Sequence, residues 1–383
     1  MNQTVALTAC GSYDEPEVLD ALERVCTQAG GLDWVQPGMR VALKLNLVSA
    51  MKPETAATVH PSVVCALVRL LQQHGAQVII GDSPGGLYTP AALNHVYDVT
   101  GLRAAQALGA VLNTDVSVTE ASFPAAVQAR QFTCTAYLQQ ADAIIDVCKL
   151  KTHGMMGMSA AVKNFFGTIP GTMKPEYHYK YPKVEDFSDM LVDLCEYWKP
   201  RLCICDAVFG MEGNGPTQGT PRKIGCLMAA QSAHALDLAA CGLIGLTPSD
   251  VPTLAAAIRR GLCPEDPSAL TLTEDPALFT VPDYKTVPSQ TSVFFSYGGD
   301  GAFGRLVGKV LQRVLTPYPK LRASACIGCR KCAKICPAHA ITMENGKPRI
   351  RRSACIHCFC CQEFCPKGAM QVGRSAIMRL LEK

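Results

Sequence analysis

The sequence is poor in charged residues and has no long apolar run. Charged residues make up 18% of the 383 residues and hydrophobic residues 48%, a balance typical of a globular chain that buries a large core. Because no run of about eighteen apolar residues occurs, we expect no membrane span. The first residues combine no basic stretch with an apolar one, so we expect no secretory signal and predict a cytoplasmic protein.

Motifs for the common organic cofactors are missing as well. No flavin, nicotinamide or haem signature occurs, and Gly85-Gly86 fits neither the P-loop nor the dinucleotide-binding pattern. The lysines and arginines of the C-terminal part lack the interleaved aromatic residues of a strand-binding groove. We therefore do not expect nucleic acid as a partner.

Cysteine, in contrast, is abundant, and eight of the twenty cysteines form two copies of one spacing. Within each copy three cysteines stand at every third position, and a fourth follows four residues later, directly before proline. The two copies are Cys326, Cys329, Cys332 and Cys336, and Cys355, Cys358, Cys361 and Cys365. Every cysteine is separated from its counterpart by the same offset (326 to 355, 336 to 365), so this segment is an internal repeat in which each copy builds half a domain.

This spacing is typical of iron–sulfur ligands and resembles the bacterial two-cluster ferredoxin module. Three thiolates on a tight loop can surround one cluster, whereas the cysteine before proline points away and serves the other. We predict two [4Fe–4S] clusters, one held by Cys326, Cys329, Cys332 and Cys365, the other by Cys355, Cys358, Cys361 and Cys336. Zinc knuckles or a disulfide framework are the alternatives, but neither needs a third cysteine in each run or the Cys-Pro pair. Cys360 is expected to be a spectator thiol.

Charge divides the chain into two unequal parts. From Lys320 to the end there are 13 Lys and Arg against 3 Asp and Glu, which leaves 23 against 29 for residues 1–319. A basic cluster region can dock on the acidic body of its own chain, on an acidic partner protein, or near an anionic substrate. The twelve other cysteines, 20 minus 8, are scattered through apolar segments, as expected for core residues in a reducing compartment.

Strands and helices alternate through the first 300 residues. This rhythm predicts an α/β fold with a doubly wound, mostly parallel sheet, in which ligands bind at the carboxyl ends of strands. We expect three parts, which are an α/β domain over residues 1–300, an amphipathic helix and linker over 301–321, and a small α+β ferredoxin-like domain over 322–383.

Polar residues stand in or directly after several apolar strands. Lys44 and Asn46 lie on one face of the strand predicted over 40–48, where a lysine without a partner is costly. That strand either lies at an exposed edge or meets an anion. Asp82 and Asp206 each end an apolar strand, at the edge where α/β proteins bind ligands.

The densest group of cations follows the strand that begins near residue 141. Lys149, Lys151 and His153 come after its apolar part, and Lys163 and Asn164 follow a turn of small residues. Loops at strand ends carry function more often than solvated faces do, so these residues are candidates for a binding or catalytic site. His153 alone is equally well explained as a structural histidine.

A glycine- and proline-rich loop supplies the last candidates. Its residues include Glu212 and Asn214, and its exposed amides could hold an anion, although simple turn chemistry explains it equally well.

The segments that carry these residues together resemble the DUF362 family, which often ends in the same ferredoxin module. They are Lys44–Asn46, Lys149–His153, Val162–Gly167 and Asp206–Pro216. The resemblance implies no established reaction. The run Ser159–Lys163 is also remotely similar to the segment that anchors the nickel-pincer cofactor of lactate racemases, which would imply cofactor attachment at Lys163.

We expect a redox protein whose clusters exchange electrons with a site in the α/β domain and with a redox partner protein. Lys44, Lys151 and Lys163 would bind an anionic small molecule, and His153, Asp82 or Glu212 would handle protons. Two alternatives stay open, namely a non-catalytic electron carrier and a racemase-like isomerase with redox-sensing clusters. An additional organic or metal cofactor is unknown.

Overall fold

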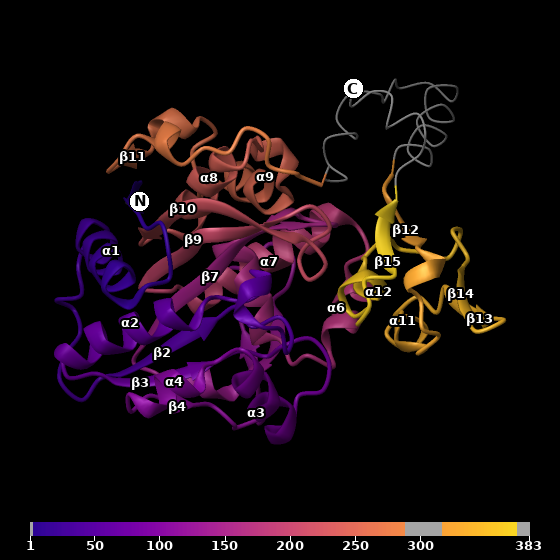
Figure 1. The fold of residues 1–383 in the computed structure, drawn as a ribbon, viewed down its shortest axis with the longest axis horizontal. Coiled ribbons are helices and arrows are strands. Elements are labelled where there is room, and N and C mark those ends of the chain that lie inside the picture. Colours follow the sequence, from indigo (N-terminus) through magenta and orange to yellow (C-terminus); the bar gives the residue numbers. More distant parts are fainter. Residues whose placement is uncertain (1–2, 288–315, 374–383) are drawn as a thin grey trace.

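The computed structural model describes residues 3–287 and 316–373. A large α/β body carries a smaller, cysteine-rich region at one end (Figure 1). Most of the amphipathic helix and linker predicted over 301–321 falls outside the described residues. Its last part is not a linker, because Tyr318–Leu321 forms a strand, β12, that pairs with β15 of the small region. The proposed division of the chain at residues 300 and 322 stays a prediction.

One sheet of nine strands runs through the body, in the order β11-β1-β10-β9-β7-β2-β3-β4, with β8 paired to β7. β9, β7, β2, β3 and β4 are mutually parallel, whereas β10 is antiparallel to both β9 and β1. The predicted α/β class with a mostly parallel sheet is confirmed. The strands of this sheet are β1 Thr4–Ala9, β2 Arg40–Leu45, β3 Gln77–Gly81, β4 Val111–Leu112, β7 Ala143–His153, β8 Gly157–Ser159, β9 Leu202–Glu212, β10 Thr220–Ala230 and β11 Thr271–Leu272.

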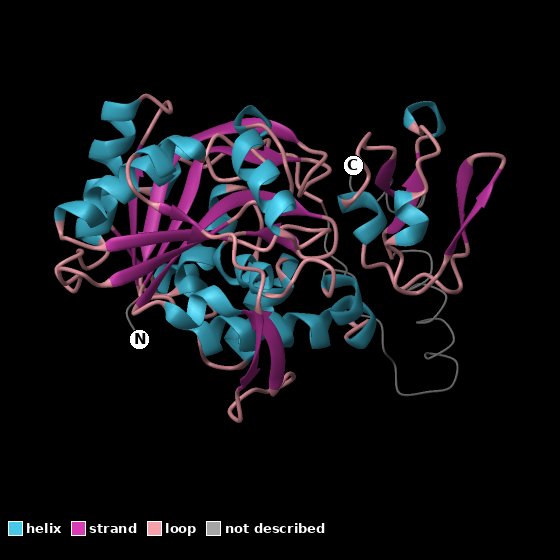
Figure 2. Ribbon diagram, turned by 90° about the horizontal axis from the view of Figure 1, so that it is seen from below, coloured by secondary structure: helices cyan, strands magenta, loops and turns pink. Residues whose placement is uncertain are grey.

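Helices cover both faces of the sheet, as a doubly wound fold requires (Figure 2). Leu22 and Leu67 belong to the apolar layer on one face, and Phe187 and Leu236 to the layer on the other. A separate hairpin, β5 Val118–Ser122 and β6 Gln131–Thr135, extends from the body. The helices are α1 Glu15–Gln28, α2 Pro61–Gln73, α3 Pro90–Val99, α4 Arg103–Ala107, α5 Ala161–Asn164, α6 Lys174–Lys180, α7 Val184–Trp198, α8 Ala233–Leu243 and α9 Pro252–Arg259.

Local sequence sets the ends of α2 in the way helix-capping rules predict. His60 is the N-cap, and its Nδ1 accepts a hydrogen bond from the Ser62 amide at 3.2 Å. Pro61 stands at the first helical position, where its missing N–H leaves no hydrogen bond unmade. Gly75 follows the helix with a φ of 81°, which a glycine adopts without strain.

Two central strands extend further than the sequence suggests. β7 continues through Lys149, Lys151 and His153, which we expected to follow the strand. β9 likewise continues to Glu212. Both extensions are stabilised by antiparallel neighbours, since β7 pairs with β8 over Lys151 to His153 and β9 pairs with β10 as far as Glu212. These neighbours satisfy backbone groups that the parallel sheet alone would leave unpaired.

The small region repeats its structure with the period of its cysteines. Helix α12 is the counterpart of α11, strand β14 that of β12, and β15 that of β13, each at the offset that separates the two copies of the cysteine spacing. Even the backbone conformation repeats, because Arg330 and its counterpart Phe359 have φ values of 63° and 61°. The bounds are β12 Tyr318–Leu321, α11 Lys331–Lys334, β13 Ile341–Glu344, β14 Lys347–Ile350, α12 Cys360–Glu363 and β15 Met370–Gly373.

Candidate functional site

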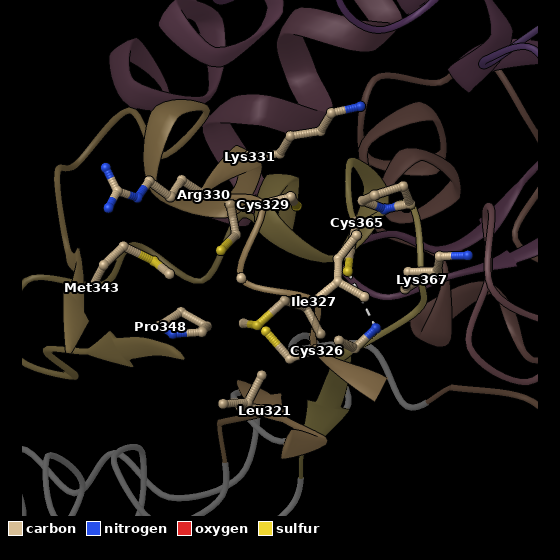
Figure 3. A pocket seen from close by; sticks show the side chains of 15 residues that line it. Leu321, Cys326, Ile327, Cys329, Arg330, Lys331, Met343, Pro348, Cys365 and Lys367 are labelled. Carbon is tan, nitrogen blue, oxygen red and sulfur yellow. Dashed lines mark hydrogen bonds between the residues drawn. The ribbon is translucent and has the colours of Figure 1, made fainter. Parts of the chain in front are cut away.

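One cavity of the small region is surrounded by the first predicted ligand set. Its wall includes Leu321 together with four cysteines, Cys326, Cys329, Cys332 and Cys365 (Figure 3). Three of these cysteines come from the first copy of the repeat, and Cys365 comes from the second. The crosswise contribution expected from the spacing is therefore present in the fold.

A second cavity contains the other four cysteines, Cys355, Cys358, Cys361 and Cys336. Neither cavity is lined by a histidine or a carboxylate, so all metal-ligating side chains in both walls carry sulfur. The empty space, with its opening to solvent, is about 360 Å³ in the first cavity and 330 Å³ in the second. That space suits a four-iron cluster better than one zinc ion bound directly by four thiolates.

Backbone amides point at several of the sulfur atoms. The Ala340 amide donates to Sγ of Cys336 at 3.3 Å, and the equivalent Ala369 amide donates to Sγ of Cys365 at 3.2 Å. Such donors stabilise the negative charge of a thiolate and help to set the potential of a bound cluster. None of the twenty cysteines takes part in a disulfide.

The second copy of the repeat docks on the α/β body through the loop after β9. Nε2 of Gln362 donates to the carbonyl oxygens of Asn214 at 2.9 Å and of Gly215 at 3.2 Å. The amide of Val372 donates to Oδ1 of Asn214 at 3.2 Å, and Nε2 of Gln218 donates to the Cys365 carbonyl at 3.1 Å. Asn214, predicted as a ligand-binding residue, thus contacts the small region.

Apolar packing completes this contact. A Cβ atom placed on Gly85 would lie 2.8 Å from Cζ of Phe364, and one placed on Gly154 would lie 3.0 Å from a methyl group of Val372. Phe359 is buried in the same apolar cluster as the core of the body. The second cavity therefore lies on the side of the small region that faces the body.

A histidine of β7 and a glutamate of α12 meet at this interface. Nε2 of His153 lies 3.0 Å from Oε1 of Glu363, without the alignment of a full hydrogen bond. Nδ1 of His153 accepts from the amides of Met155 and Met156, so the proton of the neutral ring sits on Nε2. Burial and the charge of Lys163 lower the pKa of His153 to about 4. Burial would raise the pKa of Glu363, but His153, Lys163 and His178 outweigh it and hold this pKa at about 2.

Lys163 and Lys174 lie beside the same ring. Nζ of each is 5.8 Å from the centre of the Phe166 ring. Among the described residues Lys163 has no ion pair within 4 Å, and its pKa is lowered by burial, against the opposing charge of Glu363. Burial lowers the pKa of Lys174 to about 7. An amine with a lowered pKa and no close counter-ion is suited to bind an anion.

Lys44 occupies the centre of a buried polar network. Its Nζ is 2.9 Å from Oδ1 of Asp82 and 3.3 Å from Oδ1 of Asn164. Nδ2 of Asn164 donates to Oδ1 of Asp146 at 2.7 Å, and the Leu47 amide donates to Oδ2 of Asp82 at 2.8 Å. The lysine is therefore neither at an exposed edge nor without a partner, and Asp82 is its counter-ion.

Lys151 joins this network through Asn46. Its Nζ donates to Oδ1 of Asn46 and to the Ala57 carbonyl, both at 2.7 Å, and Nδ2 of Asn46 donates to Asn164. Burial and the charge of Lys163 lower the pKa of Lys151 to about 7. Six predicted residues, Lys44, Asn46, Asp82, Lys151, Asn164 and, through its charge, Lys163, are thus brought together.

Lys149 and Asp206 form a separate ion pair. Nζ of Lys149 lies 2.9 Å from Oδ2 of Asp206, and both side chains are buried. Tyr13 donates to the other carboxylate oxygen at 2.9 Å, and the His60 amide donates to Oδ2 at the same distance. Since every group of this set has a partner, it fixes the N-terminal segment against the sheet.

Glu212 lies away from these groups. Its carboxylate accepts from the Lys285 amide at 3.1 Å and is 3.4 Å from the Lys285 ammonium group. No contact between Glu212 and Lys163, His153 or Lys44 is found in the described part of the chain.

Comparison with known proteins identifies both parts of the chain. The sequence model of DUF362, a domain of unknown function, matches residues 41–242, which is more than half of the chain. The model of a 4Fe-4S dicluster domain matches residues 318–366. The chain belongs to the DUF362 family. The predicted family is confirmed, and the small region is an iron–sulfur domain of the ferredoxin type, which supports an electron-transfer role.

A curated relative and two solved structures resemble this DUF362 protein. It is 34% identical over 273 residues to a thylakoid-associated protein, sll1697, of Synechocystis sp., covering 69% of this chain and 81% of that protein. The lactate racemase apoprotein of Thermoanaerobacterium thermosaccharolyticum matches 64% of this chain with a TM-score of 0.41 and 9% identity. A Thermotoga maritima protein matches 56% with a TM-score of 0.32 and 12% identity. The chain spans only 57% and 55% of the lengths of these two structures.

Three residues of the candidate site in the DUF362 protein were not predicted. Lys174 and His178 both lie in helix α6, which was not among the candidate segments. Pro175 at the start of this helix and Glu176 in its first turn were a usable signal. Glu363 had no signal, because its partner His153 lies in the other region of the chain.

The helices of residues 3–287 and 316–373 include none with the length and apolar character of a membrane span.

Proposed function

We propose that this DUF362 protein is an iron–sulfur oxidoreductase in which two [4Fe–4S] clusters exchange electrons with an anionic small molecule bound beside Lys163. The observation that carries this proposal is the position of Glu363. This residue lies between two predicted cluster ligands of the second copy, and its carboxylate meets His153 of the DUF362 domain. The second cysteine cavity is therefore adjacent to the buried lysines Lys151, Lys163 and Lys174 of the DUF362 domain, which we call the cationic group.

The proposed ligands follow from the two cavities. Cys326, Cys329, Cys332 and Cys365 hold one cluster, and Cys355, Cys358, Cys361 and Cys336 hold the other. When bound, such clusters supply one-electron transfer. Apolar side chains around the sulfurs, such as Ile341 and Ile356, exclude water, and the amides of Ala340 and Ala369 stabilise the thiolates.

The cationic group supplies the anion site. Lys163 has no ion pair of its own among the described residues, and Lys151 and Lys174 have pKa values lowered to about 7 by burial. An incoming carboxylate or phosphate would favour the protonated, charged form of these amines. It would take the place that the carboxylate of Glu363 holds next to them. Lys44, Asn46 and Asn164 position this group, since their side chains are all engaged with one another.

His153 is the proposed hydrogen-bond donor to the bound anion. It is neutral at pH 7, and its Nε2–H faces the interface where the anion would lie. Asp82 acts through Lys44, and Glu212 contacts Lys285 and takes no part at this place. A cytoplasmic setting is part of the proposal, because free buried thiols such as Cys148 and Cys203 are typical of proteins in reducing compartments.

Anion binding to the iron-loaded protein tests the proposal. A panel of small carboxylates and phosphate esters is titrated by calorimetry into wild type, Lys163→Ala and the exposed control Lys183→Ala. We expect at least one anion to bind and Lys163→Ala to weaken it at least tenfold, or about 1.4 kcal/mol, with unchanged iron content. If no anion binds, or if Lys163→Ala binds as well as the control, the proposal fails and a non-catalytic carrier becomes the better account.

A further inference from the structure

The internal repeat gives the small region two equivalent faces, which can be compared within one molecule. In the second copy, α12 and the residues on either side of it present Phe359, Cys360, Glu363 and Phe364 to the DUF362 domain. At the corresponding positions the first copy has Arg330, Lys331, Lys334 and Ile335. Because the two halves share one backbone conformation, these residues form the corresponding face of the first copy.

Burial differs sharply between the two faces. Phe359 is 1% exposed and Cys360 2% exposed, because the DUF362 domain covers them. Their counterparts Arg330 and Lys331 are exposed. Ile327 is 62% exposed, and the neighbouring Cys329 is the exposed member of its ligand set. The first face therefore leaves an apolar side chain and a cluster ligand at the surface.

Charge differs as well. The side chains of Arg330, Lys331 and Lys367 point away from the first cavity (Figure 3). Both carboxylates of residues 318–373 are already engaged, since Glu344 pairs with Arg349 at 2.9 Å and Glu363 faces His153. The exposed face around Ile327 is therefore positively charged, with no unpaired carboxylate from the described part of the small region to neutralise it.

We propose that this face, made of Ile327, Cys329, Arg330, Lys331 and Lys367, is the docking surface for a small acidic protein that carries one electron at a time. The proposal rests on the proposed function and names the partner that supplies or removes its electrons. Charge complementarity selects an acidic partner and speeds its approach, and Ile327 provides the apolar centre that such contacts need.

The exposed position of Cys329 shortens the path between the two proteins. In each encounter the carrier loses one electron and this chain gains it, or the reverse, and no bond or proton is exchanged. The order from outside to inside is the first cavity, the second cavity and then the cationic group at Lys163, because α12 of the second copy contacts the DUF362 domain.

Stopped-flow reduction by a purified acidic flavodoxin, taken as the hydroquinone, tests the docking surface on the full-length, iron-loaded protein. The variants are Arg330→Glu/Lys331→Glu and Lys331→Glu/Lys367→Glu. The control is the double reversal Arg24→Glu/Arg69→Glu on the exposed sides of α1 and α2, at the other end of the molecule (Figure 1). Iron content and reduction by dithionite show whether each variant still holds its clusters.

We expect the wild-type rate to fall as salt is added, and both surface variants to react at least tenfold more slowly at low salt, with a flattened salt dependence. The control should react like wild type. Iron-loaded surface variants that react at the wild-type rate would overturn the docking surface, while the anion site at Lys163 would stand. Wild-type self-association that these reversals abolish would assign the face to a second copy of the chain and also overturn the proposal.

Discussion

Nε2 of His153 lies 3.0 Å from Oε1 of Glu363, across the interface between the DUF362 domain and the iron–sulfur domain. The His153 side chain is 1% exposed and that of Glu363 17% exposed, so the contact is largely withdrawn from solvent. Lys163 adds positive charge around the same carboxylate, whereas burial lowers the pKa of His178 to about 3 and keeps its ring neutral at pH 7. A single side chain thus connects the second cysteine cavity with the cationic group of the other domain.

Replacing Glu363 with Gln should loosen this interface. The amide keeps the size of the side chain but loses the charge that faces His153, Lys163 and His178. We expect the free energy needed to open this interface to fall by about 1–3 kcal/mol, the usual cost of leaving a buried polar group without its partner. Hydrogen exchange of the peptide that spans α12 and β15 should become faster. Glu344→Gln, which breaks only an exposed pair with Arg349, is the control and should leave this exchange unchanged.

Iron content tests the ligand sets. Cys329→Ala and Cys358→Ala should each reduce the iron of the purified protein to about half, because each removes a ligand of one cluster only. Cys360→Ala is a matched control, since Cys360 is two residues from Cys358 and lines the second cavity without belonging to a ligand set. Full iron in both ligand variants, or a loss in the Cys360 variant equal to theirs, would mean that the ligands are wrongly assigned.

Gly167→Ala should disturb the buried Lys44–Asp82 pair. A Cβ atom at this position would overlap Oδ1 of Asp82 and Nζ of Lys44. We expect a loss of about 1–3 kcal/mol in the free energy of unfolding, the usual cost of overpacking, measured by urea denaturation. Gly242→Ala in helix α8 meets no atom within 4 Å and should be neutral or slightly stabilising. Equal stability of the two variants would contradict the tight packing around Lys44.

The stability of the protein should rise with pH through Lys151. Its pKa is about 7 in the folded protein and 10.5 when unfolded, so between these values the unfolded chain holds a proton that the folded chain has lost. The free energy of unfolding then increases by about 1.4 kcal/mol per pH unit from this group. Below pH 7 both states are protonated and the contribution is constant.

Urea denaturation of wild type and Lys151→Met at pH 7.5, 8.5 and 9.5 measures this slope by difference. Lys174, whose pKa is also about 7, contributes to both proteins alike and cancels. Parallel pH profiles of the two proteins would show that Lys151 keeps its ordinary pKa.

The structural features that depend on local residue spacing were predicted from the sequence. The period of the cysteine repeat reappears in the helices, the strands and the backbone angles of the iron–sulfur domain. The alternation of strands and helices likewise predicted the α/β sheet of the DUF362 domain. In both cases neighbouring residues carry the information, so no long-range contact had to be known.

Contacts between residues far apart in the chain could not be predicted from the sequence. Lys149 was a candidate for anion binding, but Asp206 on the neighbouring parallel strand neutralises it, and only the register of β7 and β9 shows this. Asn214 was a candidate for ligand binding, but its side chain contacts the iron–sulfur domain. Glu363 contacts a histidine of the other domain, far earlier in the chain, which no local pattern indicates.

The most direct test is stopped-flow reoxidation of the anaerobically reduced protein by fractionated cell metabolites, with wild type, Lys163→Ala and Lys183→Ala compared at equal iron content. Electron transfer at the cationic group predicts that one fraction of small anions reoxidises wild type and the Lys183 variant rapidly, and the Lys163 variant at least tenfold more slowly. Reoxidation of the Lys163 variant at the wild-type rate, or no response to any fraction, would contradict a reaction site beside Lys163.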